Sequence, residues 1–522
     1  MFIDARQVQS GSEISADICI IGAGAAGIAI AREFLGTKTS VCVVESGGLD
    51  PASDVQALAK GASVGLPYPD LETTRVRVFG GSTNHWGGEC RPLDAQDFAV
   101  REWIPHSGWP ITLQDLVPYY RRAADVVETG PYEYYASDWS AVSRFRAGLR
   151  PWRAAAAELT PRVFQNSPPT RFGTRYRAEL EAAPNIRVLL RADFTAFQTD
   201  EEKRLVDAIK VATLDGRDFA VKARVFVLAT GALENARLLL ISAGETASFG
   251  NQSGAVGRFF QEHVAHQWLA SLLPATSFAV SDYEPPRQGS VALAFTAAEQ
   301  RQRKLANFLV FLDGRRAGAD SEGVHSARTL LGGLQTGNMP DNVFEHLRRI
   351  MADLPGVTRY AYRRLTGAAD AVGFVEIGFV TEQMPNPDSR VRLSGRRDAL
   401  GMPMTELDWQ LTDLDRQAML AGLENVVRVI GANGLGRVKV MVPEDGADWL
   451  TRIGMSFHPM GTTRMHDDPR HGVVDANCRV HGMQNLYVAG SSVFPTSGAG
   501  SPTYTLVTLA LRLADHLKRD AA

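Results

Sequence analysis

Three short stretches of this 522-residue chain combine residue types that could carry out chemistry. The stretch FGGSTNHWGGE, from Phe79 to Glu89, places four glycines around His85 and a tryptophan. Glycine at that density indicates that the backbone lies against another group or adopts a positive φ. Farther along the chain, His458 lies in a neutral stretch and Ser501 ends a glycine- and serine-rich loop. An imidazole and a hydroxyl can both exchange a proton or a hydrogen bond with a substrate.

The residues alone leave the role of each candidate open. His458 is either a hydrogen-bonded core histidine or a general base, and Ser501 is either an N-cap or a contact to the reacting atom. The nearby His466 and His471 stand among acidic and basic residues, and no metal-binding spacing joins them. We therefore expect a solvated turn there and no metal.

The elements that must position these residues begin with a nucleotide-binding pattern. The segment ADICIIGAGAAGIAIAREFLG predicts a strand (residues 17–21), a tight turn and a helix that ends near Gly36. Gly22, Gly24 and Gly27 form G-x-G-x-x-G, which serves for the turn, for approach to a pyrophosphate and for helix–strand packing. The free N–H groups of the helix N-terminus favour phosphates. A dinucleotide site follows from this arrangement.

A second strand refines the choice of nucleotide. SVCVVESGG ends in Glu45, 23 residues after Gly22, where a carboxylate can accept hydrogen bonds from ribose hydroxyls. The same charge would repel a 2′-phosphate, which disfavours NADP. NAD and FAD both remain open on this evidence.

The C-terminal segment NLYVAGSSVFPTSGAGSPTYTLVTLALRLADHLK repeats the pattern. It predicts a strand (residues 486–489), a loop (residues 490–501) and a helix that opens at Pro502, with Ser501 as N-cap. A second helix N-terminus at a glycine-rich loop suits a flavin, because the reduced, anionic edge of the ring is stabilised by the helix dipole. This second helix N-terminus, at the C-terminal end of the chain, favours FAD over NAD.

Composition limits the function classes. Hydrophobic residues make up 45% of the chain, charged residues 22%, and the net charge is −3, which does not favour a nucleic-acid partner. Four cysteines (19, 42, 90 and 478) show no CxxC or zinc spacing, which indicates reduced thiols and a cytoplasmic location. The first fifteen residues lack the apolar core of a signal peptide, and residues 18–31 are too short to span a membrane.

Together these segments resemble the glucose–methanol–choline (GMC) oxidoreductases over nearly the whole chain. The resemblance is carried by IIGAGAAGIAIA, GGSTNHWGG, VLATGALENARLLL, VGRFFQEH, EQMPNPDSRVRLS, HPMGTTRM and the C-terminal segment quoted above. GGSTNHW, GALENARLL and HPMGTTRMHDD are most similar to the carbohydrate-oxidising branch, with pyranose oxidases and fructose dehydrogenase.

The resemblance implies an FAD enzyme that oxidises a primary or secondary hydroxyl, of a sugar or glycoside, to a carbonyl. It implies that His458 takes the hydroxyl proton while hydride passes to flavin N5. Because imidazole has a reference pKa of about 6.5, it must be neutral at working pH to act as a base. Ser501 departs from the family, which commonly has Asn or His there, so either Ser501 or Thr503 is expected to contact the reacting oxygen.

The resemblance also implies that His85 contacts the flavin, by packing or through a covalent bond to the 8α-carbon. We expect the backbone of VLATGALENARLLL to cross the pyrophosphate and the backbone of Asp193–Phe194 to face the adenine. The predicted cofactor-binding residues are Gly22, Gly24, Ala25, Ala26, Gly27, Glu45, Ser46, Gly80, Gly81, Ser82, Asn84, His85, Trp86, Gly87, Phe194, Thr230, Gly231, Asn235, Gly490, Ser491, Pro502 and Thr503.

The expected fold is α/β, with a Rossmann-like FAD-binding domain and an α+β substrate (cap) domain built on an antiparallel sheet. The FAD-binding domain covers residues 1–260, with small substrate-domain insertions around 100–170. The cap domain covers 261–450, and 451–522 return to the FAD-binding domain with the catalytic segment. Thr412 and Asp415 predict a capped helix in the cap. The charged stretch 315–363 predicts an insertion or lid.

Several alternatives stay open. The substrate is a small alcohol or sugar, and the electron acceptor is O₂, another acceptor or an electron-accepting protein partner. A relative acting on a non-sugar alcohol in biosynthesis and a redox-silent lyase are the rival functions. The sequence excludes neither a monomer nor an oligomer.

Overall fold

The computed structural model describes residues 1–135, 138, 155, 157–244, 248–275, 289–316, 321–336, 339–340, 342–366, 372–443, 446 and 448–520. Most of the stretch 136–156, within the insertions expected around 100–170, lies outside the described residues. Among the described residues, no helix is long and apolar enough to cross a membrane.

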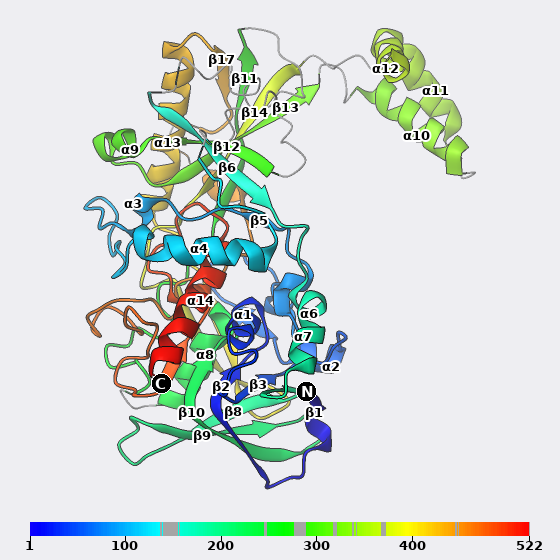
Figure 1. The fold of residues 1–522 in the computed structure, drawn as a ribbon. Helices are drawn as coiled ribbons and strands as arrows, with labels where there is room; N and C mark the ends of the chain where they lie inside the picture. Colours follow the sequence, from blue (N-terminus) through cyan, green and yellow to red (C-terminus); the bar gives the residue numbers. More distant parts are fainter. Residues whose placement is uncertain are drawn as a thin grey trace.

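The first sheet gathers strands from both ends of the chain (Figure 1). Its order is β1-β7-β3-β2-β10-β9-β8, and β19 also pairs with β10. The β8–β9 and β9–β10 pairings are antiparallel, and all other pairings in this sheet are parallel. The bounds are β1 (Phe2–Asp4), β2 (Glu13–Ile21), β3 (Val41–Glu45), β7 (Ile186–Leu190), β8 (Asp193–Thr199), β9 (Val206–Ala212), β10 (Asp218–Leu228) and β19 (Leu486–Val488).

This sheet is covered by helices, and its strands are apolar on both faces for that reason. Every residue of β3, VCVVE, is buried, and so are the last four of β2. Helix α1 (Ala25–Arg32) packs against α14 (Pro502–Asp520), which in turn packs against α4 (Leu113–Val127). Because α14 comes from the end of the chain, the C-terminal helix lies beside the first βα unit, as Figure 1 shows.

The parallel strands direct several loops to one edge. Strands β2, β3, β10 and β19 run in the same direction, so Ile21, Glu45, Leu228 and Val488 end at the same edge of the sheet. Ligands of such α/β sheets bind in the crevice outside the carboxyl ends of the strands. The glycine turn after β2 lies at this edge, and the α/β class of the sequence analysis is confirmed.

The second sheet has the order β17-β11-β14-β13-β12-β6-β5, with β18 also paired to β11. All of its pairings are antiparallel, as expected for the cap. Helix α13 (Asp413–Ala432) begins after Thr412, whose capping box with Asp415 is present as predicted, and it packs on the sheet's apolar core. The strand bounds are β5 (Glu89–Cys90), β6 (Leu159–Asn166), β11 (Val264–Pro274), β12 (Gly289–Phe295), β13 (Phe308–Arg316), β14 (Val372–Thr381), β17 (Gly436–Val440) and β18 (Ile453–Met455).

Strands β5, β6 and β18 of the second sheet lie outside residues 261–450. The expected boundaries of the cap domain stay a prediction. A third sheet, β15-β16-β4, joins β15 (Arg390–Arg397) and β16 (Pro403–Asp408) to β4 (Gly61–Ser63).

The charged stretch 315–363 forms the end of β13 and three helices: α10 (Glu322–Thr336), α11 (Val343–Ala352) and most of α12 (Leu354–Thr366). The three helices form an arm that extends from the second sheet (Figure 1). The described residues of this arm do not line the cavity discussed next.

Candidate active site

A cavity of about 980 Å³ lies at the carboxyl edge of the first sheet and extends to the second. Its wall includes the turn after β2, the end of β3, the loop 81–89, the turn after β10 and the start of α14. His458 and Ser501 lie on the same wall. The structure thus brings the nucleotide motif and the candidate proton-transfer residues around one space.

The turn after β2 needs its glycines for distinct reasons. At Gly22, φ is +103°, and a Cβ would lie 2.6 Å from the carbonyl oxygen of Ala229. A Cβ on Gly27 would lie 2.0 Å from the carbonyl oxygen of Gly22, so Gly27 permits helix–strand packing behind the wall. A Cβ on Gly24 would meet no atom within 4 Å, and this residue lines the cavity. A bound group can therefore approach the backbone at Gly24.

Glu45 closes this turn from the next strand. Its Oε2 accepts a hydrogen bond from the backbone N–H of Ala23 at 2.7 Å, and its Oε1 accepts from that of Gly47 at 2.7 Å. Burial raises the pKa of the carboxyl, which the two backbone donors oppose. Each carboxylate oxygen has a further lone pair, so contacts to ribose hydroxyls are compatible with this geometry.

The glycine-rich loop contains the short 3₁₀ helix η3 (Gly81–Asn84), and its glycines serve mainly the protein's own packing. A Cβ on Gly80 would lie 2.5 Å from the backbone nitrogen of Gly173. A Cβ on Gly81 would lie 3.1 Å from a Cα atom of the first glycine turn, and a Cβ on Gly88 would lie 2.7 Å from a proline side chain. Gly87 alone of the four would meet no atom within 4 Å, and it lines the cavity. Of these four glycines, Gly87 is therefore the one at which a bound group could approach the backbone without displacing protein atoms.

The two bulky residues of this loop differ in how they are held. The indole Nε1 of Trp86 donates to the carbonyl oxygen of Thr170 at 2.9 Å. His85 is exposed on the cavity wall, and among the described residues no hydrogen bond fixes its ring. Burial, and then the positive charge of Arg171, lower the pKa of His85, which keeps its ring neutral.

His458 is far from these motifs in the sequence and lies on the same cavity wall. Its backbone N–H donates to Glu262 Oε1 at 2.6 Å, and its ring Nδ1 lies 2.9 Å from Nδ1 of His263. Burial, followed by the neighbouring His263, lowers the pKa of His458 well below the usual range. A neutral imidazole with one ring nitrogen already engaged can accept a proton on the other.

A charged cluster on the wall was missed by the sequence analysis. Arg77 forms ion pairs with Glu234 at 3.0 Å and with Asp193 at 3.4 Å, and Arg75 lies 3.6 Å from Glu234. Burial opposes ionisation of Glu234, but the guanidinium groups of Arg237, Arg77 and Arg75 lower its pKa to about 2. The alternation in TTRVRV was the available signal, since residues two apart in extended chain point to the same side.

Part of this chain matches a known protein family. A family model described as GMC oxidoreductase matches residues 385–510, which include His458 and Ser501. The matched segment thus carries the signature of the GMC oxidoreductases. This match confirms the resemblance expected from the motifs.

Similar proteins align with almost the whole length of this chain. It is 28% identical to a 6′′′-hydroxyparomomycin C oxidase of Streptomyces lividus, over 97% of this chain and 92% of the relative. It is 22% identical to the fructose dehydrogenase large subunit of Gluconobacter japonicus, over 98% and 99%. Among solved structures, formate oxidase of Aspergillus oryzae and pyridoxine 4-oxidase of Mesorbium loti share its fold. Both align at 18% identity and TM-score 0.58, covering 98% and 97% of this chain and 99% of each structure.

The cavity fits FAD, the cofactor of GMC oxidoreductases. Four glycines on its wall, Gly24, Gly87, Gly231 and Gly490, leave open space where a side chain would begin, because a Cβ on each would meet no atom within 4 Å. A ligand can therefore lie directly against backbone along the cavity, with two helix N-termini to receive its phosphates. The enzyme is an FAD-dependent oxidoreductase.

Most predicted cofactor-binding residues line this cavity, and four do not. Gly27, Gly80, Asn84 and Asn235 lie behind the wall. The amide of Asn84 donates to carbonyl oxygens within its own loop, and Asn235 joins the turn after β10 to the loop after β19. These four support the cavity's shape. The predicted residues on the wall are Gly22, Gly24, Ala25, Ala26, Glu45, Ser46, Gly81, Ser82, His85, Trp86, Gly87, Phe194, Thr230, Gly231, Gly490, Ser491, Pro502 and Thr503.

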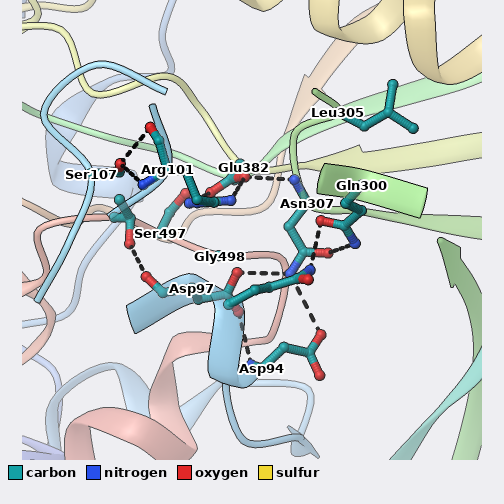
Figure 2. A network of polar contacts seen from close by, with 12 residues as sticks. Asp94, Asp97, Arg101, Ser107, Gln300, Leu305, Asn307, Glu382, Ser497 and Gly498 are labelled. Carbon is teal, nitrogen blue, oxygen red and sulfur yellow. Dashed lines mark hydrogen bonds and ion pairs between the residues drawn. The ribbon is translucent and has the colours of Figure 1, made fainter. Parts of the chain in front are cut away.

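A buried polar network joins residues beside the second sheet to the segment 94–101 (Figure 2). Arg101 donates to both carboxylate oxygens of Glu382, at 2.5 and 2.8 Å, and Glu382 also accepts from the backbone of Asn307. The Asn307 amide donates to Asp97 at 2.8 Å. Burial, with the charges of Asp94 and Glu382, raises the pKa of Asp97 to about 7. The network fixes the second sheet against the segment 94–101.

Proposed function

We propose that this enzyme oxidises a hydroxyl of a sugar or glycoside to a carbonyl, with His458 as the base that takes the hydroxyl proton. The observation that carries the proposal is the position of neutral His458 on the wall of the cavity that contains the nucleotide turn. Bound FAD supplies the acceptor for the hydride that leaves the carbon. Two relatives named for fructose and for 6′′′-hydroxyparomomycin C support a substrate of this class.

Several residues of the chain have defined parts in this proposal. The turn at Gly24 and the N-terminus of α14 bind the cofactor's phosphates and flavin edge, and Glu45 binds the ribose. Glu262 holds the backbone of His458 in place through its carboxylate. Ser501, directly before α14, lies where its hydroxyl can meet the reacting oxygen from the same cavity.

The identity of the electron acceptor and the location belong to the same proposal. We infer a cytoplasmic enzyme, because the four cysteines are buried and free. Its acceptor is O₂, another small acceptor or an electron-accepting protein.

The test is a panel of sugars and glycosides, assayed with a dye acceptor and separately for hydrogen peroxide. Non-sugar alcohols of matched size form the control set. The proposal expects turnover with members of the sugar set, and peroxide formation identifies O₂ as the acceptor. Turnover confined to non-sugar alcohols would refute the substrate class.

A further inference from the structure

A second histidine, His263, lies behind the candidate base and has no role in the function proposed so far. It directly precedes β11, and only 1% of its surface is exposed. Its Nδ1 lies 2.9 Å from Nδ1 of His458, with the two rings at 88° to each other. Its Nε2 lies 2.9 Å from the carbonyl oxygen of Gly498 and 3.3 Å from that of Ser497. Both nitrogens of His263 are therefore engaged.

The partners of His263 determine where its proton resides. A carbonyl oxygen can only accept, so Nε2 of His263 must carry the hydrogen. Burial lowers the pKa of His263 to about 4, which keeps this ring neutral. A neutral imidazole has one N–H, so Nδ1 of His263 is an acceptor. The hydrogen between the two rings must then belong to Nδ1 of His458, which leaves the lone pair of His458 on Nε2.

We propose that His263 is a positioning residue that fixes the tautomer of His458, so that Nε2 of His458 is the basic nitrogen. This inference rests on the proposed function, in which His458 is the base. In the proton transfer, the substrate O–H bond breaks, an N–H bond forms at Nε2, and the electron pair stays on the substrate oxygen. Nδ1–H of His458 continues to donate to His263, so the imidazolium is stabilised and no proton leaves the pair.

The surroundings hold this pair rigidly. Glu262 Oε1 accepts from the backbone N–H groups of both His263, at 2.9 Å, and His458, at 2.6 Å. The carbonyl that orients His263 belongs to Gly498, where φ is +55° and a Cβ would lie 2.8 Å from Asp97 Oδ2. Figure 2 shows Gly498 beside Asp97 in the network that joins the second sheet to the segment 94–101. The tautomer of His458 is thus set by backbone and network positions together.

The direct test is ¹⁵N NMR of the holoenzyme labelled at histidine side chains. The signals of His458 are assigned by their loss in His458→Ala. We expect a protonated Nδ1 and an unprotonated Nε2 for His458 at neutral pH. An unprotonated Nδ1 and a protonated Nε2 would overturn the proposal. This measurement requires no variant of His263.

Variants of His263 test the consequence. His263→Leu removes the acceptor and should slow flavin reduction by roughly 10–100-fold, the range typical for loss of a residue that orients a histidine. His263→Asn places an amide oxygen where Nδ1 was, so it should restore much of the rate and the original tautomer. His266→Leu is the matched control, because His266 on β11 is similarly buried, at 2% exposure, but its ring Nε2 lies near the hydroxyl of Thr381 and not near His458.

Two outcomes separate this inference from the proposed function. If His458→Ala reduces flavin at the wild-type rate, the assignment of the base fails. If His458→Ala is slow but His263→Leu keeps the wild-type rate and tautomer, only the positioning role of His263 fails. Bound FAD and the circular dichroism spectrum of each variant show whether folding is retained.

Discussion

At the scale of single residues, Glu45 illustrates how one carboxylate can serve both the fold and a ligand. It accepts from the N–H groups of Ala23 and Gly47, which would otherwise be unpaired at the turn. The same side chain lies on the cavity wall. Its loss leaves two backbone donors without their partner and, in the proposed cofactor site, would also remove the contacts to the ribose.

We predict that Glu45→Ala weakens FAD binding by about 1.5–3 kcal/mol, the range for hydrogen bonds to a charged group. Glu45→Gln, which keeps one accepting oxygen, should lose less. Fluorescence titration of the deflavinated proteins with FAD measures both. An unchanged dissociation constant in Glu45→Ala would contradict the ribose assignment.

Glu262 offers a prediction about pH. Burial raises its pKa to about 7, so the folded protein holds this proton more tightly than the unfolded chain does. The contribution of Glu262 to the free energy of unfolding therefore falls as pH rises from about 4.5 to about 7. The hydroxyl of Tyr68 donates to Glu262 Oε2 at 2.9 Å. Glu262→Gln lacks the titrating carboxyl, and its amide can still accept from the backbone N–H groups of His263 and His458 and donate to the Tyr68 oxygen.

The melting temperature of Glu262→Gln relative to wild type should therefore increase from about pH 4.5 to about pH 7. Differential scanning calorimetry of both proteins across this interval measures the change. A difference that is constant with pH would show that Glu262 does not titrate there.

At the scale of elements, the loop Phe79–Glu89 combines rigid and free parts. Trp86 is fixed by Thr170, whereas the ring of His85 has no hydrogen-bond partner among the described residues. A covalent flavin bond requires a ring nitrogen held against the dimethylbenzene edge. The unfixed ring favours packing against the flavin over a covalent link.

We therefore predict that acid precipitation of the purified enzyme releases yellow flavin into the supernatant. His85→Ala should bind FAD more weakly because it loses the ring contact. Yellow colour that stays in the pellet of the wild type, and leaves it in His85→Ala, would establish the covalent bond instead.

Much of the element structure could be predicted because its signals are local. The turn after β2, the cap of α13 at Thr412 and the start of α14 at Pro502 depend on residues within a few positions. The run NIRVLLRADFTAF contains two strands, since Arg191 adopts φ of 56° and turns the chain between β7 and β8. No glycine or proline marks this turn, so the pattern contains no strong sign of the break.

The contact between His263 and His458 could not be predicted from the sequence. The two residues are 195 positions apart, and their contact depends on where β11 and the C-terminal segment meet. The motif VGRFFQEH contributed to the resemblance, but its residues indicated no proton-transfer role. Likewise, the packing role of Gly80 depends on Gly173, which only the fold brings close.

At the scale of the whole molecule, the two large sheets must keep a fixed relation, because the cavity is built from both. Arg101 and Glu382, at 3% and 0% side-chain exposure, form the buried ion pair of the network in Figure 2. Removing one member of such a pair leaves an uncompensated buried charge.

We predict that Arg101→Met destabilises the protein by about 3–5 kcal/mol. The double variant Arg101→Met/Glu382→Gln should recover part of this loss, because glutamine is uncharged and can still accept from Asn307. The exposed pair Arg348–Glu345 is the control, and Arg348→Met should unfold like wild type. Chemical denaturation of the four proteins measures the differences, and equal midpoints for Arg101→Met and Arg348→Met would contradict the role of the network.

The most direct test of the central claim is anaerobic stopped-flow reduction of the bound flavin by the best sugar or glycoside of the panel. The account predicts rapid bleaching of the flavin band in wild type and reduction slowed by roughly 10²–10⁴-fold in His458→Ala, with FAD still bound. Absence of bleaching with every alcohol, or a rate in His458→Ala within a few-fold of wild type, would contradict it.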